Sequence, residues 1–420
     1  MEKKRKSISL GTIMLIITIL ALLYLVMGSL APILADIVQD VYTSYIGDSK
    51  SNINYENELL SQNYIMSYEE EQELKKKYPN YEYQGKIYYT IYGKKAIEND
   101  KTLDLSDVKI DEKLSENLKL LTELKEVNLY NQNLSKDQKL ALMQEFPNIT
   151  FKWKVDILNL NVDYNTETID LSNKTIDDME DFTKSLKLLP NLKKLDMSNS
   201  NLSNEQLGNL RTQFPNIKID WIVHLGKWSL RTDSVAFSVL IVDYNYKRMT
   251  SDDIQVLKYC TDLQALDLGH QAIEDISVIG EYLPNLRVLI LADNKIKDIS
   301  CLSKLKHLHY LELFMNDITD VSALASCTEL VDLNISFNYH FSDISPILNL
   351  PLLERAWLIA DNISPQSYQQ FRNTYPNVKL VTTGKGSTES GWRAHERYFA
   401  MIDMYRNNYI SDSFLKYDNK

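Results

Sequence analysis

Apolar residues recur along the chain in a short phrase, L-x-x-L-x-L, with a polar or turn-forming residue three positions after its last apolar position. The phrase is clearest between residues 263 and 363, where its copies begin at intervals of 23, 22, 22 and 23 residues. The turn position is occupied in these copies by Gln271, Asn294, Asn316, Asn338 and Asp361. Shorter or earlier versions include Leu103/Leu105, Leu124/Val127/Leu129 and Leu192/Leu195/Met197. A repeat of about 20 to 29 residues predicts stacked coils whose short strands pair into one parallel sheet, with the Asn side chains bonding turn backbone groups.

A second, longer pattern marks short helices with defined ends. Four serines each lie eleven residues before an aromatic residue that is followed by Pro-Asn, and the first three serines are 68 residues apart. These serines are Ser67, Ser135, Ser203 and Ser364. Glu or Gln three residues after the first three serines predicts capping boxes, and the terminal proline predicts where each helix stops. Alternating apolar residues after the Pro-Asn turns, as in 149–153 and 217–221, predict strands.

The N-terminal region has the pattern of a membrane or export signal. Four basic residues precede an uncharged run that starts at Ile8 and continues to Asp36. The apolar stretch from Ile8 to Met27 is long enough to span a bilayer, which favours a single-pass signal anchor with the rest of the chain outside the cell. Small residues near Ala31 and Ala35 leave cleavage and secretion as the alternative. The predicted division is a signal anchor or signal peptide (1–35), a spacer (36–66), the coils (67–383) and a C-terminal tail (384–420).

The repeats resemble those of exported leucine-rich-repeat proteins of Gram-positive bacteria, with internalin-like coils of 22 residues. The resemblance covers about residues 78–410 and rests on phrases such as Ala265-Leu-Asp-Leu-Gly-His270, Val288-Leu-Ile-Leu-Ala-Asp-Asn294 and Tyr310-Leu-Glu-Leu-Phe-Met-Asn316. It implies an α/β fold: a leucine-rich-repeat solenoid, or horseshoe, of about ten coils with a concave parallel β-sheet, preceded by the N-terminal transmembrane or signal helix. Proteins of this class generally act as binding scaffolds, and the ligand differs from one to another.

The residue between the last two apolar positions of each phrase should point away from the core, because side chains alternate along a strand. This outward column comprises Asp104, Asn128, Asp170, Asp196, Ser238, Asp267, Ile290, Glu312, Asn334 and Trp357. Its early part is acidic, whereas its later part is flanked by aromatic residues and arginine. The predicted ligand-binding residues are Tyr310, Glu312, Phe314, Arg355 and Trp357, with Asp267 and Ile290. The aromatic side chains would anchor a partner with basic and apolar features, and Glu312 and Arg355 would orient it. The alternative is a solvent-facing column that only prevents aggregation.

Composition supports recognition over chemistry. The net charge of −11 disfavours nucleic acid as a partner, and three cysteines, an odd number, do not indicate a disulfide framework. His307 and His309 lack a third ligand for a metal, and no catalytic or phosphate-binding motif is present, so we predict no enzyme activity, no metal and no cofactor. The predicted function is noncatalytic binding of a protein or peptide. The alternatives are a structural component of the cell envelope and an enzyme whose site assembles only in the fold.

The tail from Arg393 to Arg406 places apolar residues at helical spacing, which predicts an amphipathic helix. Because a solenoid exposes an apolar end, the helix is expected to cap the last coil. Docking to another protein is the alternative.

Overall fold

The computed structural model describes the chain except for residues 1–17, 19–64, 78–84, 240–246, 360–361 and 416–420. The described chain forms two compact units, one holding residues up to Asn133 with Leu142–Phe151, the other holding Leu134–Ala141 and residues from Lys152 onward. The predicted membrane segment 8–27, apart from Thr18, and the predicted spacer up to residue 64 lie outside the described residues. Among the helices that are described, none is both long and apolar enough to cross a bilayer.

The first unit contains two small sheets. In the first sheet, β1 (Ile65–Ser67) pairs in parallel with β2 (Lys86–Ile91), and β2 forms an antiparallel hairpin with β3 (Lys94–Ile97). The helix between β1 and β2 in sequence is α4 (Tyr68–Lys77). The second sheet has the order β4 (Thr102–Asp104), β5 (Glu126–Asn128) and β6 (Thr150–Lys152). Its strands are connected by α5 (Leu114–Lys119) and α6 (Lys136–Glu145).

The second unit begins with the same arrangement. An antiparallel hairpin, β7 (Lys154–Ile157) and β8 (Leu160–Asp163), precedes a parallel sheet of β9 (Thr168–Asp170), β10 (Lys194–Asp196) and β11 (Lys218–Asp220). The connecting helices are α7 (Met179–Lys187) and α8 (Asn204–Gln213). Another antiparallel hairpin follows, formed by β12 (Ile222–Leu225) and β13 (Trp228–Arg231). The hairpins start at residues 86, 154 and 222, so they repeat with the 68-residue interval of the serine pattern.

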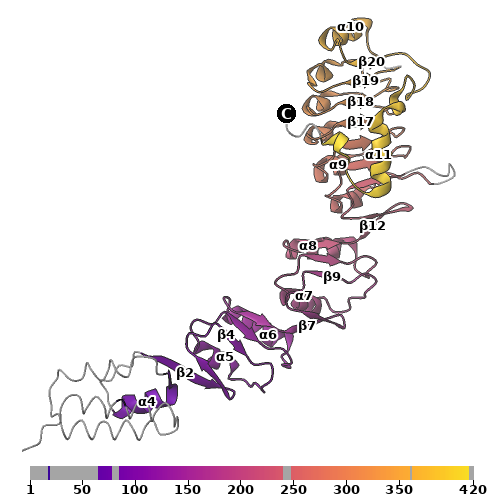
Figure 1. The fold of residues 1–420 in the computed structure, drawn as a ribbon. Helices are drawn as coiled ribbons and strands as arrows, with labels where there is room; N and C mark the ends of the chain where they lie inside the picture. Colours follow the sequence, from indigo (N-terminus) through magenta and orange to yellow (C-terminus); the bar gives the residue numbers. More distant parts are fainter. Residues whose placement is uncertain (1–17, 19–64, 78–84, 240–246, 360–361, 416–420) are drawn as a thin grey trace, which may run out of the picture. The chain divides into compact units, whose positions relative to one another are not determined.

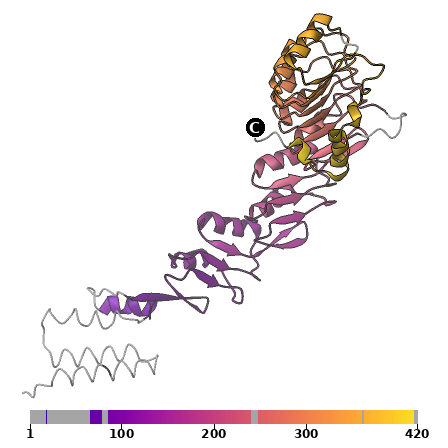
Figure 2. The ribbon, with the colours of Figure 1, turned by 45° about the horizontal axis from the view of Figure 1, so that its top comes forward.

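The longest sheet has seven parallel strands in sequence order. They are β14 (Ala236–Ser238), β15 (Ala265–Asp267), β16 (Val288–Ile290), β17 (Tyr310–Glu312), β18 (Asp332–Asn334), β19 (Arg355–Trp357) and β20 (Lys379–Val381). The chain returns between strands through the short helices η1 (Gln255–Tyr259), α9 (Ser277–Tyr282), η2 (Ser300–Lys304), η3 (Ser322–Ser326), η4 (Ser345–Asn349) and α10 (Pro365–Thr374). Figures 1 and 2 show these return helices on one side of the sheet and the C-terminal helix α11 (Glu396–Asn407) on the other side.

The leucine-rich positions form the core of the coils, as predicted. The central residues of β15 to β18, Leu266, Leu289, Leu311 and Leu333, lie in register and have no exposed surface. The turn-position amides form a ladder. Asn316 donates from Nδ2 to the carbonyls of Leu291 (2.9 Å) and Leu313 (3.0 Å), and its Oδ1 accepts from the backbone N–H of Ile296 (3.0 Å). Asn294 and Asn338 make equivalent bonds one coil away, which confirms the predicted role of these side chains.

The predicted helix ends are also confirmed. Ser67, Ser135 and Ser203 each accept from the backbone N–H three residues on, and each backbone N–H of these serines donates to the Glu or Gln at that position. Ser364 accepts from the backbone N–H of Ser367. These reciprocal bonds satisfy N–H groups that have no partner within the helix.

The prediction of one continuous sheet of about ten coils is wrong for the described residues, because their parallel strand pairs are divided among four sheets: β1–β2, β4–β6, β9–β11 and β14–β20. After β6 and β11 the chain passes directly into an antiparallel hairpin, without a return helix. The next parallel strand therefore starts a new sheet. The seven strands β14–β20 are the longest uninterrupted part of the solenoid.

Candidate functional site

The concave face, defined as the face of β14–β20 opposite the return helices, is covered by the C-terminal segment, residues 384–415. This segment contains η5 (Trp392–Ala394), α11 and η6 (Asp412–Phe414), and α11 contacts β14 and β15. Figure 1 shows α11 running across the strands. The predicted helix at 393–406 is thus present, but it lies along the sheet and does not cap the last coil. At the far end of α11, Asn408 Oδ1 accepts from the backbone N–H groups of Val235 (2.8 Å) and Ala236 (3.2 Å), at the start of the first strand.

Trp392 is the aromatic anchor of the C-terminal segment. Its side chain is fully buried, with ring centroids 4.9 Å from Trp357 and 5.2 Å from Tyr310. The Arg355 guanidinium lies 4.6 Å from the Trp392 ring and donates to the Trp392 carbonyl (3.1 Å). The indole N–H donates to Glu312 Oε1 at 2.7 Å. Two tilted or edge-to-face ring contacts, a cation–π contact and a charge-assisted hydrogen bond therefore hold the Trp392 side chain.

Asp332 is the charged anchor. Its carboxylate is fully buried and accepts two bonds from Arg397, from Nε (2.6 Å) and from Nη2 (2.9 Å). Arg355 donates a third bond from Nε (2.6 Å), and Arg397 also reaches Glu354 at 2.7 Å. Burial opposes the charge of Arg397, but the hydrogen bonds with Asp332 outweigh it and raise the pKa of this guanidinium. A fork-shaped donor matched to a buried carboxylate gives both energy and orientation.

Glu312 is a buried carboxylate with hydrogen bonds to one of its two oxygens. Its Oε1 accepts from both Trp392 and the hydroxyl of Tyr310, whereas its Oε2 has no hydrogen-bond partner among the described residues. Arg393 is the nearest cation, with Nη2 at 3.5 Å from Oε2. Burial raises the pKa of the Glu312 carboxyl, and Arg393 opposes the shift. Burial also raises the pKa of Tyr310 well above its ordinary range, so Tyr310 stays a donor.

Six of the seven predicted binding residues are buried, so the prediction that these side chains face solvent is wrong. The six are Ile290, Tyr310, Glu312, Phe314, Arg355 and Trp357, while Asp267 is partly exposed. Their side chains do point away from the coil core, as expected. The structure brings Tyr310, Glu312, Arg355 and Trp357 together around Trp392. Ile290 and Phe314 join an apolar cluster with Met401 and Met404 of α11. Asp267 is held by the Ser238 hydroxyl and the Gly269 backbone N–H.

The sequence interpretation missed Asp332, Trp392 and Arg397. Asp332 occupies the first strand position, in register with Tyr310 and Arg355, whereas the prediction used mainly the position two residues later. Opposite charges on Asp332 and on the tail were visible in the sequence. No sequence pattern in the strands matches the spacing of Trp392 and Arg397, so there was no reason in the sequence to place these two residues against the sheet.

The acidic early column has a local structural role. Asp104, Asp170 and Asp196 each accept from the backbone N–H of the serine two residues on, at 2.8 to 2.9 Å. Such bonds hold the turn at the end of the strand. Among the described residues, no group of three or more His, Cys, Asp or Glu side chains is positioned to hold a metal ion.

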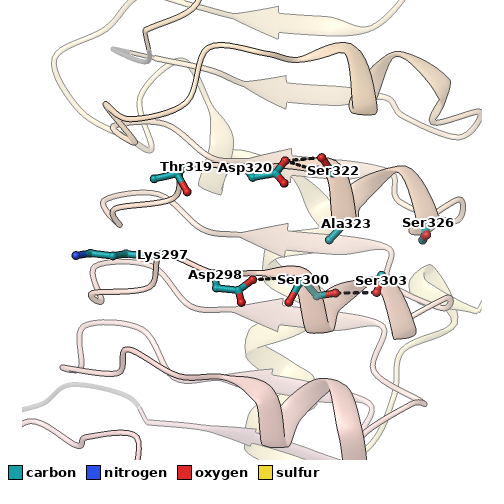
Figure 3. Close-up of a pocket in the computed structure, with 9 residues that line it drawn as sticks. All are labelled: Lys297, Asp298, Ser300, Ser303, Thr319, Asp320, Ser322, Ala323 and Ser326. Carbon is teal, nitrogen blue, oxygen red and sulfur yellow. Dashed lines mark hydrogen bonds between the residues drawn. The ribbon is translucent and has the colours of Figure 1, made fainter.

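An open recess lies between two neighbouring coils, on the side of the return helices (Figure 3). Its acidic groups are engaged by the coils themselves: Asp298 accepts from the Ser300 backbone N–H (2.7 Å) and Asp320 from that of Ser322 (2.8 Å). The same bond recurs in the flanking coils. The lining residues are Lys297, Asp298, Ser300, Ser303, Thr319, Asp320, Ser322, Ala323 and Ser326. These residues belong to the return helices η2 and η3 and to the turns that begin them.

The three cysteines are free thiols. Burial raises the pKa of Cys260 and Cys327 to about 12 and that of Cys301 to about 11. These thiols are poor nucleophiles at neutral pH, because the thiolate is the reactive form.

Comparisons with known proteins find similarity to leucine-rich repeat proteins. The family described as "Leucine Rich repeats (2 copies)" matches residues 284–325. A mouse protein named leucine-rich repeat-containing protein 56 is 31% identical over 135 residues, which is 31% of this chain and 23% of that protein. The chain thus spans about a quarter of the length of this relative.

Solved structures similar to this chain include two internalins of Listeria monocytogenes. Internalin C2 is 23% identical, with a TM-score of 0.29, over 52% of this chain and 80% of that chain. The internalin named inlF is 20% identical, with a TM-score of 0.33, over 70% of this chain and 86% of that chain.

Proposed function

We propose that this leucine-rich repeat protein is a noncatalytic recognition protein, whose concave face on β14–β20 binds a peptide segment of a partner protein. Leucine-rich repeats are generally used for protein binding. The C-terminal segment covers that face through contacts such as Trp392 to Glu312 and Arg397 to Asp332, and in this proposal it acts as an intramolecular ligand. We further propose that residues 8–27 anchor the chain in the membrane, or are cleaved on secretion, so that the coils lie outside the cell.

The observation that carries the proposal is the way the concave face holds the C-terminal segment. The segment inserts one tryptophan into an aromatic pocket and one arginine onto a buried carboxylate. Buried aromatic and arginine side chains near the centre of a contact are the residues that dominate binding energy in protein interfaces. The face therefore has the features of a peptide-binding groove.

The composition of the concave face also requires a cover. Ile290 on β16, Tyr310 on β17, Phe314 in the loop after β17 and Trp357 on β19 belong to one apolar cluster. A bare surface of this kind would promote aggregation. The face must be covered at all times, either by the C-terminal segment or by a partner that replaces it.

An exchange experiment tests this proposal on the full-length chain, purified in mild detergent because of its apolar N-terminus. A protease recognition sequence is inserted between Thr383 and Gly384, which are both exposed. Cleavage leaves residues 384–420 bound without a covalent link. A fluorescent peptide of residues 384–415 is then added, and its anisotropy is followed.

We expect saturable uptake by the cut chain and competition by unlabelled peptide. The uncut insertion chain is the matched control. A short tether holds its own segment at roughly millimolar effective concentration, so it should take up the labelled peptide far more weakly. Absence of uptake by the cut chain, or its unfolding on cleavage, would show that residues 384–415 are an integral part of the fold and would overturn the proposal.

The second candidate function is a structural component of the cell envelope with no diffusible ligand. The observation in its favour is a pair of exposed apolar side chains in the loops after the strands, Met315 (47% exposed) and Tyr339 (59% exposed), which could contact a neighbouring envelope component. Association with the cell wall that resists extraction, together with no peptide exchange, would favour this role.

A further inference from the structure

Resting on the proposed function, we infer that the partner of the concave face is another protein that presents a basic, aromatic helical segment: a Trp-Arg pair, then a second arginine five residues after the tryptophan. This spacing is that of Trp392, Arg393 and Arg397 in the C-terminal segment. The partner competes with the C-terminal segment for the same two sockets, named here the indole socket and the carboxylate socket.

The indole socket consists of Tyr310, Glu312, Arg355 and Trp357. It selects tryptophan because the ring fills the space between the Trp357 and Tyr310 rings, while the indole N–H supplies the bond to Glu312 Oε1. Phenylalanine in the same place would remove that donor from a buried carboxylate. Leaving a buried charged group with fewer donors is strongly unfavourable.

The carboxylate socket consists of Asp332 with Arg355 beside it and Glu354 at its edge. Arg355 is fixed by its own bond to Asp332 Oδ1, which leaves both carboxylate oxygens open to a second guanidinium. Lysine has one point donor and would satisfy only part of this arrangement. The socket therefore distinguishes arginine from lysine.

The C-terminal segment is an imperfect ligand for these sockets. Four buried polar atoms of this contact have no hydrogen-bond partner among the described residues: Glu312 Oε2, Arg355 Nη2, Arg393 Nε and Tyr405 Oη. Each such atom lowers the affinity of the contact by leaving a desolvated group without a hydrogen bond. The segment of a second copy of this chain would have the same defects, so the better ligand is a different protein.

The exchange assay with the cut chain tests this inference, with all substitutions placed in the labelled peptide so that the protein itself is unchanged. Relative to the parent peptide, Trp392→Ala should weaken binding by about 30-fold or more and Arg397→Ala by about 100-fold or more. Arg397→Lys should weaken it by about 10-fold. Phe399→Ala and Arg406→Ala are the matched controls, since both side chains are exposed on the same helix. They should change affinity by less than about 3-fold.

One further substitution tests whether the C-terminal segment is imperfect. Tyr405→Phe removes a buried hydroxyl without a partner and should tighten binding by about 5-fold. Tyr409→Phe is its control, because the exposed Tyr409 hydroxyl donates only to Asp403 of the same segment (2.6 Å) and its loss should change affinity by less than about 3-fold. If Tyr405→Phe does not tighten binding, or if light scattering shows the uncut chain exchanging segments in a dimer, the assignment to a different protein is overturned.

The outcomes separate the inference from the proposed function. If the parent peptide is not taken up, the proposed function fails. If the parent peptide exchanges but Trp392→Ala and Arg397→Ala weaken it no more than their controls, the face binds peptides without these two sockets. The inference is then wrong while the proposed function stands.

Discussion

Replacing Asn316 by leucine tests what holds the coils together. Leucine branches at Cγ as asparagine does, so the substitution removes the hydrogen bonds of the side chain while keeping its branching. Asn316 is buried and makes three good bonds: to the carbonyls of Leu291 and Leu313 and from the Ile296 backbone N–H. The substitution therefore tests the contribution of the ladder.

The expected loss follows from which groups keep a partner. The Leu291 carbonyl also accepts from Asn294, and the Leu313 carbonyl also accepts from Asn338, so both stay bonded after the substitution. The Ile296 N–H loses its only side-chain acceptor. Two lost bonds at about 0.5 to 1.5 kcal/mol each, plus one unpaired buried donor at about 1 to 3 kcal/mol, give a loss of about 2 to 6 kcal/mol.

Hydrogen exchange followed by mass spectrometry is the appropriate assay, because in a repeat protein such a loss opens neighbouring coils before the whole chain unfolds. We expect the peptide around Ile296 to exchange much faster in Asn316→Leu, and the urea midpoint to fall. Asn373→Leu is the control, since Asn373 is exposed on α10 and should leave both measurements unchanged. Equal protection of Ile296 in the wild type and in Asn316→Leu would refute the assigned role of the ladder.

Three further substitutions probe other parts of the second unit. Burial raises the pKa of Glu312 above its ordinary 4.5. The stability that the protonated Glu312 carboxyl contributes is therefore fully present below pH 4.5 and is lost as the pH rises through the folded-state pKa. Glu312→Gln should flatten the curve of melting temperature against pH over this range. Gly280→Ala should destabilise the chain by about 1 to 3 kcal/mol in urea titrations, because the new Cβ would lie 2.3 Å from the Cys301 carbonyl oxygen; an unchanged midpoint would contradict this contact. Met315→Asn should raise stability by about 0.5 to 1 kcal/mol, since Met315 is 47% exposed at φ 57°, a left-handed conformation that asparagine adopts more readily; a lower melting temperature would argue against this source of strain.

Local periodicity was sufficient to predict the coils. The capped helices and the Asn ladder depend on residues a few positions apart or exactly one coil apart, so the repeat displays them directly. The hairpins were missed because their turns lack the usual Asn-Gly signal. Leu158 and Asn159 form the turn of β7–β8 with positive φ at both residues, and leucine is an unexpected residue at such a position.

The contact between the C-terminal segment and the sheet could not be predicted from periodicity. Strand alternation gives the direction of Glu312 and Trp357, which is correct, but it carries no information about which distant segment lies over them. Arg397 reaches Asp332 across 65 residues of sequence, and Trp392 reaches Glu312 across 80. Only the charge complementarity of the two regions was available, and many other pairs in the chain share it.

The same outward column serves different purposes in the two parallel sheets of the second unit. In β9–β11, Asp170 and Asp196 retain access to solvent, and each accepts from the backbone N–H of the serine two residues on. That sheet therefore needs no cover. In β14–β20, Glu312 is fully buried and depends on a side chain from beyond the coils. A buried carboxylate that is not satisfied by its own coil is stable only while a donor from elsewhere stays in place. The recognition that we propose is therefore placed on the seven-stranded sheet, where the affinity of the C-terminal segment is the value that a partner would have to exceed.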